Sequence, residues 1–421
     1  MIRQLGIPAL ALATALAVVL APAAHAQSAW TLKGATIYPS PDAPPIQDGQ
    51  VIISGKKIQA VAASSNSRTP AAPTKSPECN GGVVVAGFQN SHVHFTGDEY
   101  ADAGHKPADA LTRSLTNMLT RYGYTTVFDI TSDRDSTVAL RARIEKGEVR
   151  GPRIMTVGFA LFPPNGLPIY IAHMRKSLLD ELPQPATVDA ALKVLEQNFA
   201  AGTDGTKLFI ATPQADNSIK RMSADIMRAA TEATHRRGQL VFVHPTDFIG
   251  VQAALDAHVD ILAHPPLGQP APWPEALLKQ VRDSGMSMIP TLKLLPFELQ
   301  KQQVPPEVAK RLVNESVQEF GRFAALGGQV LFGTDVGYMT DFDPTLEYEL
   351  MAQAGMTPMQ ILASLTITPA ARWHEQDRRG RLAAGMDADI VVLNADPAGS
   401  PRNFANVRCV IRGGEVIYAR K

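Results

Sequence analysis

The sequence predicts an α/β protein built around a parallel (β/α)8 barrel, the TIM barrel. Eight apolar runs of strand-forming residues follow one another between residues 83 and 335, and helix-like segments separate most of them. Strands that are apolar throughout are typical of parallel sheets covered on both faces. An open doubly wound sheet is the competing fold, but no G-x-G-x-x-G motif follows the first run. The length of 421 residues suits one large barrel with an accessory module.

The chain begins with a segment that is typical of a secretory signal. Arg3 is followed by an apolar stretch, and Ala-His-Ala stands before Gln27 as an A-x-A cleavage site. We therefore expect residues 1–26 to be a signal peptide, cut after Ala26, and the mature chain to be periplasmic or secreted. A membrane anchor is the alternative, but Pro22 and small residues end the apolar run. Because no second long apolar segment follows, we expect no stable membrane insertion.

Two β-rich segments stand at the ends of the mature chain. Residues 30–62 contain short β-type pieces separated by Pro, Asp-Gly and Gly-Lys turns, which predicts a small antiparallel sheet. Residues 388–397 and 406–421 have the same character, and the Pro/Ser-rich residues 64–78 are expected to form a surface loop.

The barrel strands and helices are expected between these two ends. Residues 108–123 and 223–238 are typical of amphipathic helices, and each segment ends in a glycine that can cap it. The eight strands are expected at residues 83–94, 125–131, 153–159, 206–211, 239–246, 260–266, 287–293 and 329–335.

The composition excludes several classes of partner. Hydrophobic residues make up 45% of the chain and charged residues 19%, so the chain can bury a sizeable core. The formal net charge is zero and no long like-charge run occurs, which argues against nucleic acid as a partner. The same balance argues against an anionic membrane as a partner, and a homo-oligomer stays possible.

Side chains that bind metals stand at the carboxyl ends of several expected strands, where catalytic groups of such barrels lie. Residues i and i+2 of a strand point to the same face, so an H-x-H pair can bind one cation, and two further histidines can bind a second. A carboxylate beside them can bind metal and also transfer a proton. Imidazole with carboxylate suits Zn²⁺ and, less exclusively, Mn²⁺, Fe or Co²⁺. The candidate ligands are His92 and His94 in the first strand, Lys207 in the fourth, His244 in the fifth, His264 in the sixth and Asp335 in the eighth.

Each of these features also has an ordinary structural explanation. An H-x-H pair occurs by chance, a histidine at a strand end is often a satisfied polar residue, and Lys207 alone could extend its ammonium group to solvent. Gly-Thr-Asp at residues 333–335 could be only a turn. Their joint occurrence on the expected strand ends predicts a metal site.

The ordered motifs resemble those of the amidohydrolase superfamily over nearly the whole mature chain. The similarity rests on AGFQNSHVHF, the lysine of GTKLFI, VFVHP, ILAHPP and LFGTD, and on the tail TPAARW…GRLAAGMDADIVVLNADP. Within the superfamily the chain looks closest to the imidazolonepropionase-like branch, which includes prolidase-type dipeptidases and ochratoxin-hydrolysing amidohydrolases.

This resemblance implies a domain organisation. A (β/α)8 barrel would span residues 86–383, and a β-sandwich would form from residues 27–85 and 384–421. Both cysteines, Cys79 and Cys409, would then lie in the β-sandwich, where a disulfide is a hypothesis. Two free thiols in the unreduced protein would contradict it.

The resemblance also implies a reaction. Lys207 would be carboxylated by CO₂ and bridge two divalent ions, with Zn²⁺ expected. His92, His94 and Asp335 would complete one metal site, and His244 and His264 the other. The metals would lower the pKa of a bridging water and polarise the substrate carbonyl. Asp335 would take the proton from this nucleophile and pass it to the leaving amine.

The function that follows is an exported, metal-dependent amidohydrolase that uses a metal-bridging hydroxide on the peptide-like amide of a dipeptide or N-acyl amino acid. A mononuclear deaminase or cyclic-amide hydrolase is the alternative, whose relatives carry an H-x-x-E motif after strand five. Here the stretch runs from His244 to Asp247, a partial match only. Lactones, carbamates and ochratoxin-type amides stay open as substrates. A binding protein without turnover would be favoured by a missing ligand, and none is missing.

Four further residues are candidate substrate contacts. Tyr170 and His173 follow the third strand, Lys293 follows the seventh and Tyr338 follows the eighth. Lys293 could pair with an anionic substrate group, and either tyrosine could hold a substrate carboxylate. Each of the four could equally be a packed or solvated loop residue.

Overall fold

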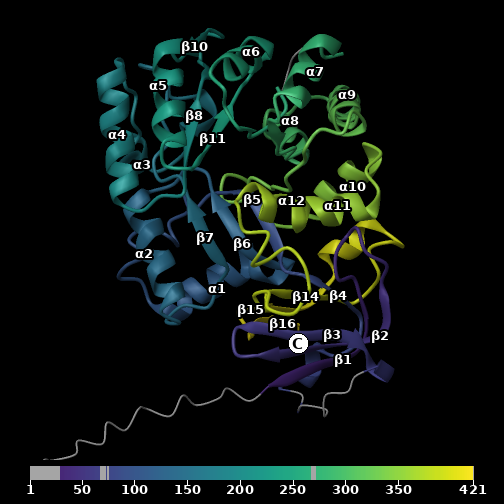
Figure 1. The fold of residues 1–421 in the computed structure, drawn as a ribbon. Coiled ribbons are helices and arrows are strands. Elements are labelled where there is room, and N and C mark those ends of the chain that lie inside the picture. The colour runs from purple at the N-terminus through teal and green to yellow at the C-terminus, as the bar shows by residue number, and fades with distance from the viewer. Residues whose placement is uncertain (1–28, 67–72, 74, 267–271, 421) are drawn as a thin grey trace, which may run out of the picture.

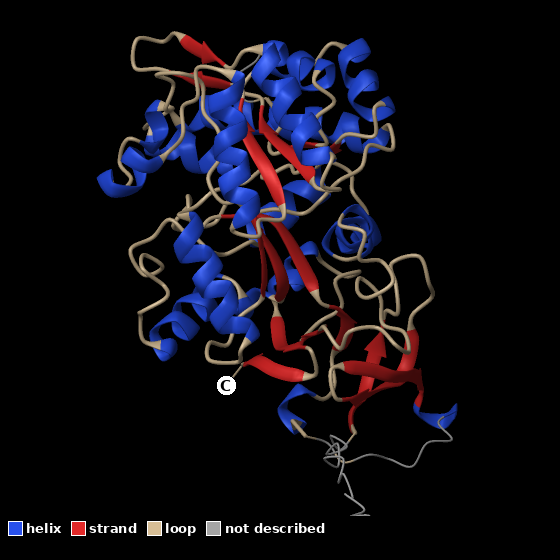
Figure 2. Ribbon diagram, turned by 60° about the vertical axis from the view of Figure 1, so that its left-hand side comes forward, coloured by secondary structure: helices blue, strands red, loops and turns tan. Residues whose placement is uncertain are grey.

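The computed structural model describes residues 29–66, 73, 75–266 and 272–420. The predicted signal peptide, residues 1–26, lies outside the described residues. A barrel of parallel strands is surrounded by helices, and a β module adjoins one end of the barrel (Figure 1 and Figure 2). The predicted fold class is confirmed. In the described part of the chain, no helix is both long and apolar enough to span a membrane.

Eight parallel segments close the barrel through backbone pairing. Strands pair in two groups, and isolated bridges join these groups to each other and to the eighth segment. The bridges link Leu161 to Leu208, Met288 to Val330, and Val93 to Val336. The predicted eighth strand, 329–335, thus takes its place in the ring, although its backbone is less regular than a strand. The other seven strands are β5 (Phe88–Val93), β6 (Tyr124–Asp129), β7 (Arg153–Thr156), β8 (Gly205–Phe209), β11 (Leu240–His244), β12 (Ile261–Leu262) and β13 (Ser287–Met288).

Helices surround the barrel, as the sequence predicts. The helix expected at 108–123 is α1 (Ala108–Met118) with a 3₁₀ turn, η3 (Thr120–Tyr122), and Gly123 ends it with a φ of 93°. The helix expected at 223–238 is α5 (Ala224–His235), which the Ser223 side chain caps. The remaining elements around the barrel are α2 (Arg134–Glu145), η4 (Ile169–Ile171), α3 (Lys176–Glu181), α4 (Val188–Ala200), β9 (Ala211–Pro213), β10 (Ile219–Arg221), α6 (Phe248–Asp256), α7 (Glu275–Asp283), α8 (Leu294–Lys301), α9 (Pro306–Ala325), α10 (Thr345–Gln353), α11 (Pro358–Leu365) and α12 (Ile367–Arg372).

Apolar side chains fill the lower interior of the barrel. The Phe128 and Phe242 rings lie 4.7 Å apart, and Trp373 packs against both, at 4.9 and 5.8 Å. This packing closes the barrel toward the amino ends of its strands. A cavity can therefore form only toward the carboxyl ends.

The β module combines both ends of the described chain in one sheet of seven strands. The sheet folds over, so that residues from both halves share one apolar core. At the fold, the Ala388 amide donates to the Lys56 carbonyl at 2.8 Å. The strand order is β16 (Glu415–Ala419), β15 (Val407–Arg412), β14 (Ile390–Leu393), β4 (Val83–Ala86), β1 (Trp30–Ile37), β2 (Ile46–Ser54) and β3 (Lys57–Ala63), with 3₁₀ turns η1 (Ser64–Asn66), η2 (Pro77–Cys79) and η5 (Pro401–Ala405).

One predicted strand, 83–94, is in fact two strands in two different sheets. β4 belongs to the β module and β5 to the barrel, with only Gly87 between them. A Cβ atom at Gly87 would lie 2.2 Å from the Thr125 hydroxyl oxygen and 2.9 Å from its Cβ. Glycine therefore lets the chain pass close to β6 as it leaves the module. Periodicity alone could not reveal this change, because both halves are equally apolar.

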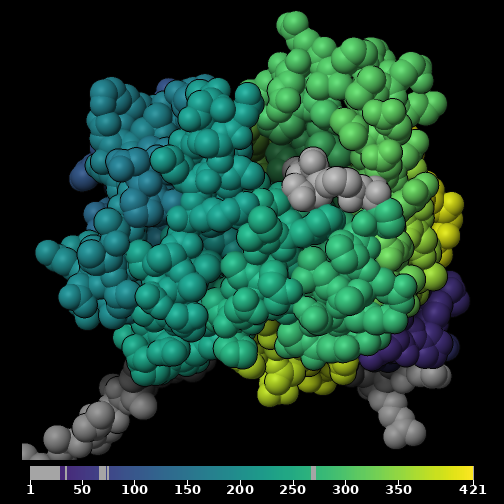
Figure 3. All heavy atoms as spheres, turned by 90° about the horizontal axis from the view of Figure 1, so that it is seen from above, coloured from purple at the N-terminus to yellow at the C-terminus, as the bar shows by residue number. Residues whose placement is uncertain are grey.

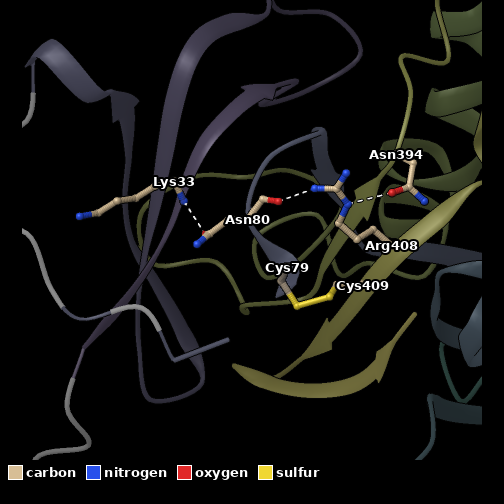
Figure 4. Close-up of a disulfide and its surroundings, with 6 residues drawn as sticks. All are labelled: Lys33, Cys79, Asn80, Asn394, Arg408 and Cys409. Atoms are coloured by element: carbon tan, nitrogen blue, oxygen red, sulfur yellow. Dashed lines mark hydrogen bonds between the residues drawn. A yellow bond between two sulfur atoms is a disulfide. The ribbon is translucent and has the colours of Figure 1, made fainter. Parts of the chain in front are cut away.

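A disulfide ties the two parts of the β module together (Figure 4). It joins Cys79 to Cys409, which are 330 residues apart in sequence, and both cysteines are buried. Beside it, the Lys33 amide donates to the Asn80 side chain at 3.0 Å, and the Arg408 guanidinium donates to the Asn80 carbonyl. The pairing agrees with the hypothesis drawn from the sequence.

Candidate metal centre

The structure brings all six predicted ligands to the lining of one cavity, at the carboxyl ends of the barrel strands. Five of them are buried, and His244 is partly buried. A close approach of the eighth segment to β5 makes this possible. A Cβ atom at Gly333 would lie 2.8 Å from the Cβ of His92, so only glycine fits there. Asp335 follows two residues later and lies directly beside the H-x-H pair.

Two imidazoles and one carboxylate converge on a single point. The Nε2 atoms of His92 and His94 lie 3.2 Å apart, and they lie 3.2 and 2.9 Å from Oδ1 of Asp335. That oxygen is buried and has no hydrogen-bond partner with acceptable geometry among the described residues. Buried polar atoms are seldom left unpaired. Three possible ligand atoms that face one another in a buried site fit a cation, and this donor set suits Zn²⁺.

His264 and His244 extend this cluster. The His264 ring lies 4.7 Å from the His92 ring and 4.9 Å from the His244 ring, measured between ring centres. Ligand atoms of His92, His264 and Asp335 all lie within 4.8 Å of one another. This trio includes members of both predicted sites. How the ligands divide between two ions therefore stays a prediction.

Burial sets the protonation states of the cluster. It lowers the pKa of His92 to about 4 and that of His244 to about 3, so both rings are neutral and able to bind metal near pH 7. Burial also lowers the pKa of Lys207 to about 7, although Asp335 opposes it. Burial alone would raise the pKa of Asp335, but His92 and His94 hold it well below its usual range. The carboxylate is therefore ionised.

Two threonines fix the orientation of ligand histidines. The Thr131 carbonyl accepts a hydrogen bond from Nδ1 of His94 at 2.7 Å, and the Thr291 hydroxyl lies 2.6 Å from Nδ1 of His264. Because the carbonyl can only accept, Nδ1 of His94 carries the proton and Nε2 of the neutral ring keeps its lone pair toward the cluster. Such outer contacts orient metal-binding histidines and tune their affinity.

Backbone strain is concentrated at the same strand ends. Thr246 and Thr291 have φ values of 63° and 41°, and Asp335 has a φ of 59°. Positive φ is uncommon for any residue with a Cβ, and for a β-branched residue it is a clear outlier. Strain of this kind costs roughly 1–3 kcal/mol at each residue and gathers at functional sites.

The cavity above the cluster has a volume of about 380 Å³. In the view from above, the surface is hollowed between the teal segments and the green lobe that carries α8 and α9 (Figure 3). The six predicted ligands form its floor. Apolar residues form most of its walls, and these are Phe162, Ile171, Met174, Leu178, Leu182, Phe209, Pro213, Pro265, Leu294, Leu295 and Leu299.

The four predicted substrate contacts divide into two pairs. Tyr170 and Tyr338 line the cavity, and the Tyr170 hydroxyl lies 3.3 Å from Nε2 of His244. His173 is exposed, 6.0 Å from the Tyr338 ring, and is not part of the lining. Lys293 is buried and donates to the Asp341 and Asp343 carbonyls at 3.0 and 2.5 Å, away from the lining. The placement of this second pair gives no support to a substrate contact.

Asp247, the acid that the mononuclear alternative would need, is engaged elsewhere. Its carboxylate accepts hydrogen bonds from Arg221 at 3.1 and 2.5 Å and caps α6 through the Gly250 amide at 2.8 Å. It does not line the cavity. Its structural role accounts for the partial match to H-x-x-E.

Three residues near the centre were not anticipated. Thr131 and Thr291 stand at the ends of expected strands, and that position was the one available signal. Glu298 lines the cavity from α8, and its carboxylate accepts a hydrogen bond from the Tyr338 hydroxyl at 2.5 Å. No motif marks Glu298, because its role arises from a contact 40 residues away.

The similarity to known proteins covers most of the chain. The family model described as Amidohydrolase family matches residues 83–417. No curated protein matches this chain by sequence.

Several solved structures have the same fold. A Xaa-Pro dipeptidase with bound methionine superposes with a TM-score of 0.77 at 20% identity, over 93% of this chain and 100% of the other. Ochratoxinase from A. niger gives 0.75 at 17% identity, over 93% and 96%. A putative prolidase from Bifidobacterium longum gives 0.74 at 24% identity, over 93% and 95%. At these identities the likeness shows the fold alone.

Proposed function

The chain belongs to the amidohydrolase family, and from that premise we propose that it is an exported, metal-dependent hydrolase that cleaves a peptide-like amide in a small molecule. The observation that carries the proposal is the convergence of the His92, His94 and Asp335 ligand atoms on one buried point. Dipeptides and N-acyl amino acids are the substrate groups that the sequence favours. Export rests on the sequence of residues 1–26 alone.

The donor set supports two divalent ions, with Zn²⁺ first. His92, His94 and Asp335 would hold one, and His244 and His264 the other, with carboxylated Lys207 between them. Lys207 is 1% exposed, and its lowered pKa keeps a large share of the amine unprotonated near pH 7. That form attacks CO₂: the N–C bond forms, a proton leaves, and an anionic carbamate results. When bound, the ions would supply an acidified water and a polarised carbonyl.

The chain's own residues supply proton transfer and orientation. Asp335 is ionised and lies at the centre of the cluster, so it would accept the proton of the attacking water and later deliver it to the leaving amine. The Tyr170 hydroxyl, beside His244, would donate a hydrogen bond to the substrate or to the ring. The apolar lower barrel excludes water from beneath the reacting groups.

The mononuclear alternative has weaker support. Such an enzyme needs an acid after strand five, and Asp247 is instead paired with Arg221 and caps a helix. Hydrolysis of a lactone, carbamate or ochratoxin-type amide would use the same metal-binding residues, and this remains a second candidate within the two-metal mechanism.

Metal counting tests the proposal. The chain from Gln27 onward is purified, bound metal is measured by inductively coupled plasma mass spectrometry, and a panel of amides is assayed alongside. We expect about two divalent ions per chain and amide hydrolysis. A count of one would favour the mononuclear alternative.

Lys207→Ala tests the bridging role separately. We expect this variant to lose most of its metal and its turnover, whereas Lys310→Ala on exposed α9 should retain both. A Lys207→Ala protein with two metals and full turnover would contradict the bridge.

A further inference from the structure

Two apolar surfaces face the metal centre across the cavity. One comes from the segment after β7 and from α3. In the first of these, the Phe162 ring stacks on Phe209 of β8, with ring centres 4.3 Å apart and an interplanar angle of 14°. The other comes from α8, through Leu294, Leu295 and Leu299. Apolar surface of this kind binds apolar groups, because burying them removes apolar area from water. A ligand that fills the cavity must therefore present a bulky apolar group to these walls.

Outside the metal centre, the lining of the cavity carries negative charge and no positive charge among the described residues. Apart from the six predicted ligands, Glu298 is the one charged side chain among the described residues of the lining. Its carboxylate is held by the Tyr338 hydroxyl at 2.5 Å, and 17% of its side chain is exposed. A carboxylate of a ligand placed here would lose hydration and meet a like charge.

Three cations near the mouth each lie close to a carboxylate. Lys293 is bound to Asp341 at 2.8 Å, and Arg221 to Asp247. Lys301 lies 3.6 Å from Glu298 and 3.3 Å from the Tyr338 hydroxyl, outside the lining. None of these three cations lines the cavity.

We propose that the substrate of this site is an amide with a bulky apolar group and no carboxylate, and that Glu298 determines this specificity. The inference rests on the proposed function. It narrows the substrate class from free dipeptides and N-acyl amino acids to neutral or cationic amides, such as N-acyl amines and N-acyl amino-acid amides. Glu298 selects a hydrogen-bond donor or cation on the group beside it and excludes an anion.

Matched substrate pairs test this inference. In the first pair the carboxylate is on the amine side: N-octanoyl-4-aminobenzamide is compared with N-octanoyl-4-aminobenzoate. In the second it is on the acyl side: the anilide of octanoic acid is compared with the mono-anilide of octanedioic acid. We expect the neutral member of each pair to have at least tenfold higher kcat/KM. An N-acetyl analogue should be at least tenfold poorer than the N-octanoyl amide.

Variants assign the effect to named residues. Glu298→Gln should lower the ratio of kcat/KM between the neutral and the anionic member of each pair by several-fold, whereas Glu315→Gln on exposed α9 should leave this ratio unchanged. Leu295→Asn should reduce the preference for the long acyl chain. An anionic member that is equal to or better than its neutral partner in wild type overturns the inference.

Binding without turnover separates the two proposals. Isothermal titration of the same pairs into Asp335→Asn should keep the preference for the neutral members, whether or not any of them is a substrate. If the preference is present but wild type turns over none of the amides, the proposed function fails and the cavity inference holds. If the anionic members bind as tightly as the neutral ones, the cavity inference fails.

Discussion

Two buried carboxylates at opposite ends of the barrel show how differently this chain treats acidic groups. Asp387, at the junction with the β module, accepts hydrogen bonds from Lys57 at 2.8 Å, Arg379 at 2.9 Å and Arg378 at 3.2 Å. Asp335, in the cavity, faces two imidazole nitrogens, and its buried Oδ1 has no hydrogen-bond partner among the described residues. The first carboxylate is satisfied by the protein, and the second requires something further.

This difference in hydrogen bonding distinguishes a structural carboxylate from a functional one without the use of sequence motifs. A paired ionic network needs no ligand, and its residues hold the β module on the barrel. A buried carboxylate oxygen without a hydrogen-bond partner is costly unless a cation binds. Strained φ values occur at the strand ends around Asp335, as expected where geometry is held for function.

The sharpest test compares the same substitution at the two carboxylates. Asp335→Asn keeps the shape but removes the charge and the proton acceptor, so we expect turnover to fall roughly 10³-fold. Asp387→Asn should leave kcat nearly unchanged and lower the free energy of unfolding by about 1–3 kcal/mol. Steady-state kinetics and urea denaturation measure the two effects. The distinction breaks if Asp387→Asn loses turnover or if Asp335→Asn keeps it.

The disulfide extends the comparison to the whole β module. Cys79→Ser together with Cys409→Ser should lower the free energy of unfolding by about 2–5 kcal/mol, because the closed loop is very long. At temperatures where the variant is folded, metal content and kcat should match wild type. Thiol counting on unreduced wild type provides the control, and it should find no free thiols. A folded variant that has lost its metal would show that the two regions are coupled.

The two regions should also differ in how their contributions to the free energy of unfolding depend on pH. Because the pKa of His92 is about 4 when folded and about 6.5 when unfolded, the unfolded chain alone binds this proton between those values. The contribution of His92 to the stability of the metal-free protein is therefore fully present above about pH 6.5 and is lost as the pH drops toward 4, by roughly 3 kcal/mol.

The comparison proteins for this test are His92→Gln and Asp387→Asn. His92→Gln should lose only the share of this pH dependence that His92 contributes, because the lowered pKa values of His244 and His264 and the raised pKa of His94 are common to wild type and variant. Asp387 has a lowered pKa, so its contribution is lost only below about pH 4. Asp387→Asn should therefore parallel wild type from pH 7 to 4.5 in urea denaturation. Equal pH profiles for His92→Gln and wild type would contradict a buried, neutral His92 with a lowered pKa.

The smallest effect concerns the outer contacts of the cluster. Thr291→Val removes the hydroxyl that lies 2.6 Å from Nδ1 of His264 and keeps the β-branched shape. We expect metal affinity to fall about 10- to 100-fold, as for other outer contacts of metal-binding histidines. Competition with a fluorescent chelator measures it, and Thr291→Ser, which keeps the hydroxyl, should retain most of the affinity. Unchanged affinity in Thr291→Val would limit the metal centre to its direct ligands.

Much of the architecture was predictable, because strand periodicity and ligand order are local properties. The H-x-H spacing identifies His92 and His94 as candidate ligands, and a position at a strand end identifies the others. The division of 83–94 at Gly87 was not predictable, since both halves are apolar and only contact with Thr125 distinguishes them.

The surroundings of the centre depend on contacts between distant segments. Lys293 was expected to face an anionic substrate, yet carbonyls 48 and 50 residues away bind its ammonium group. Thr131 binds His94 from 37 residues away, and Glu298 gains its position from Tyr338. No pattern in one sequence encodes such pairings, so the ligands were predictable and their supports were not.

The single glycine between β4 and β5 has a mechanical consequence. The strand that contains His92 and ends just before His94 continues directly from the middle strand of the β module, and Gly87 is the single residue between the two strands. A tilt of the module would be transmitted along the chain to the two imidazoles, because an extended strand is nearly inextensible. We therefore expect that neither an inserted linker nor a transplanted module would be neutral at this joint, because either change would shift His92 and His94.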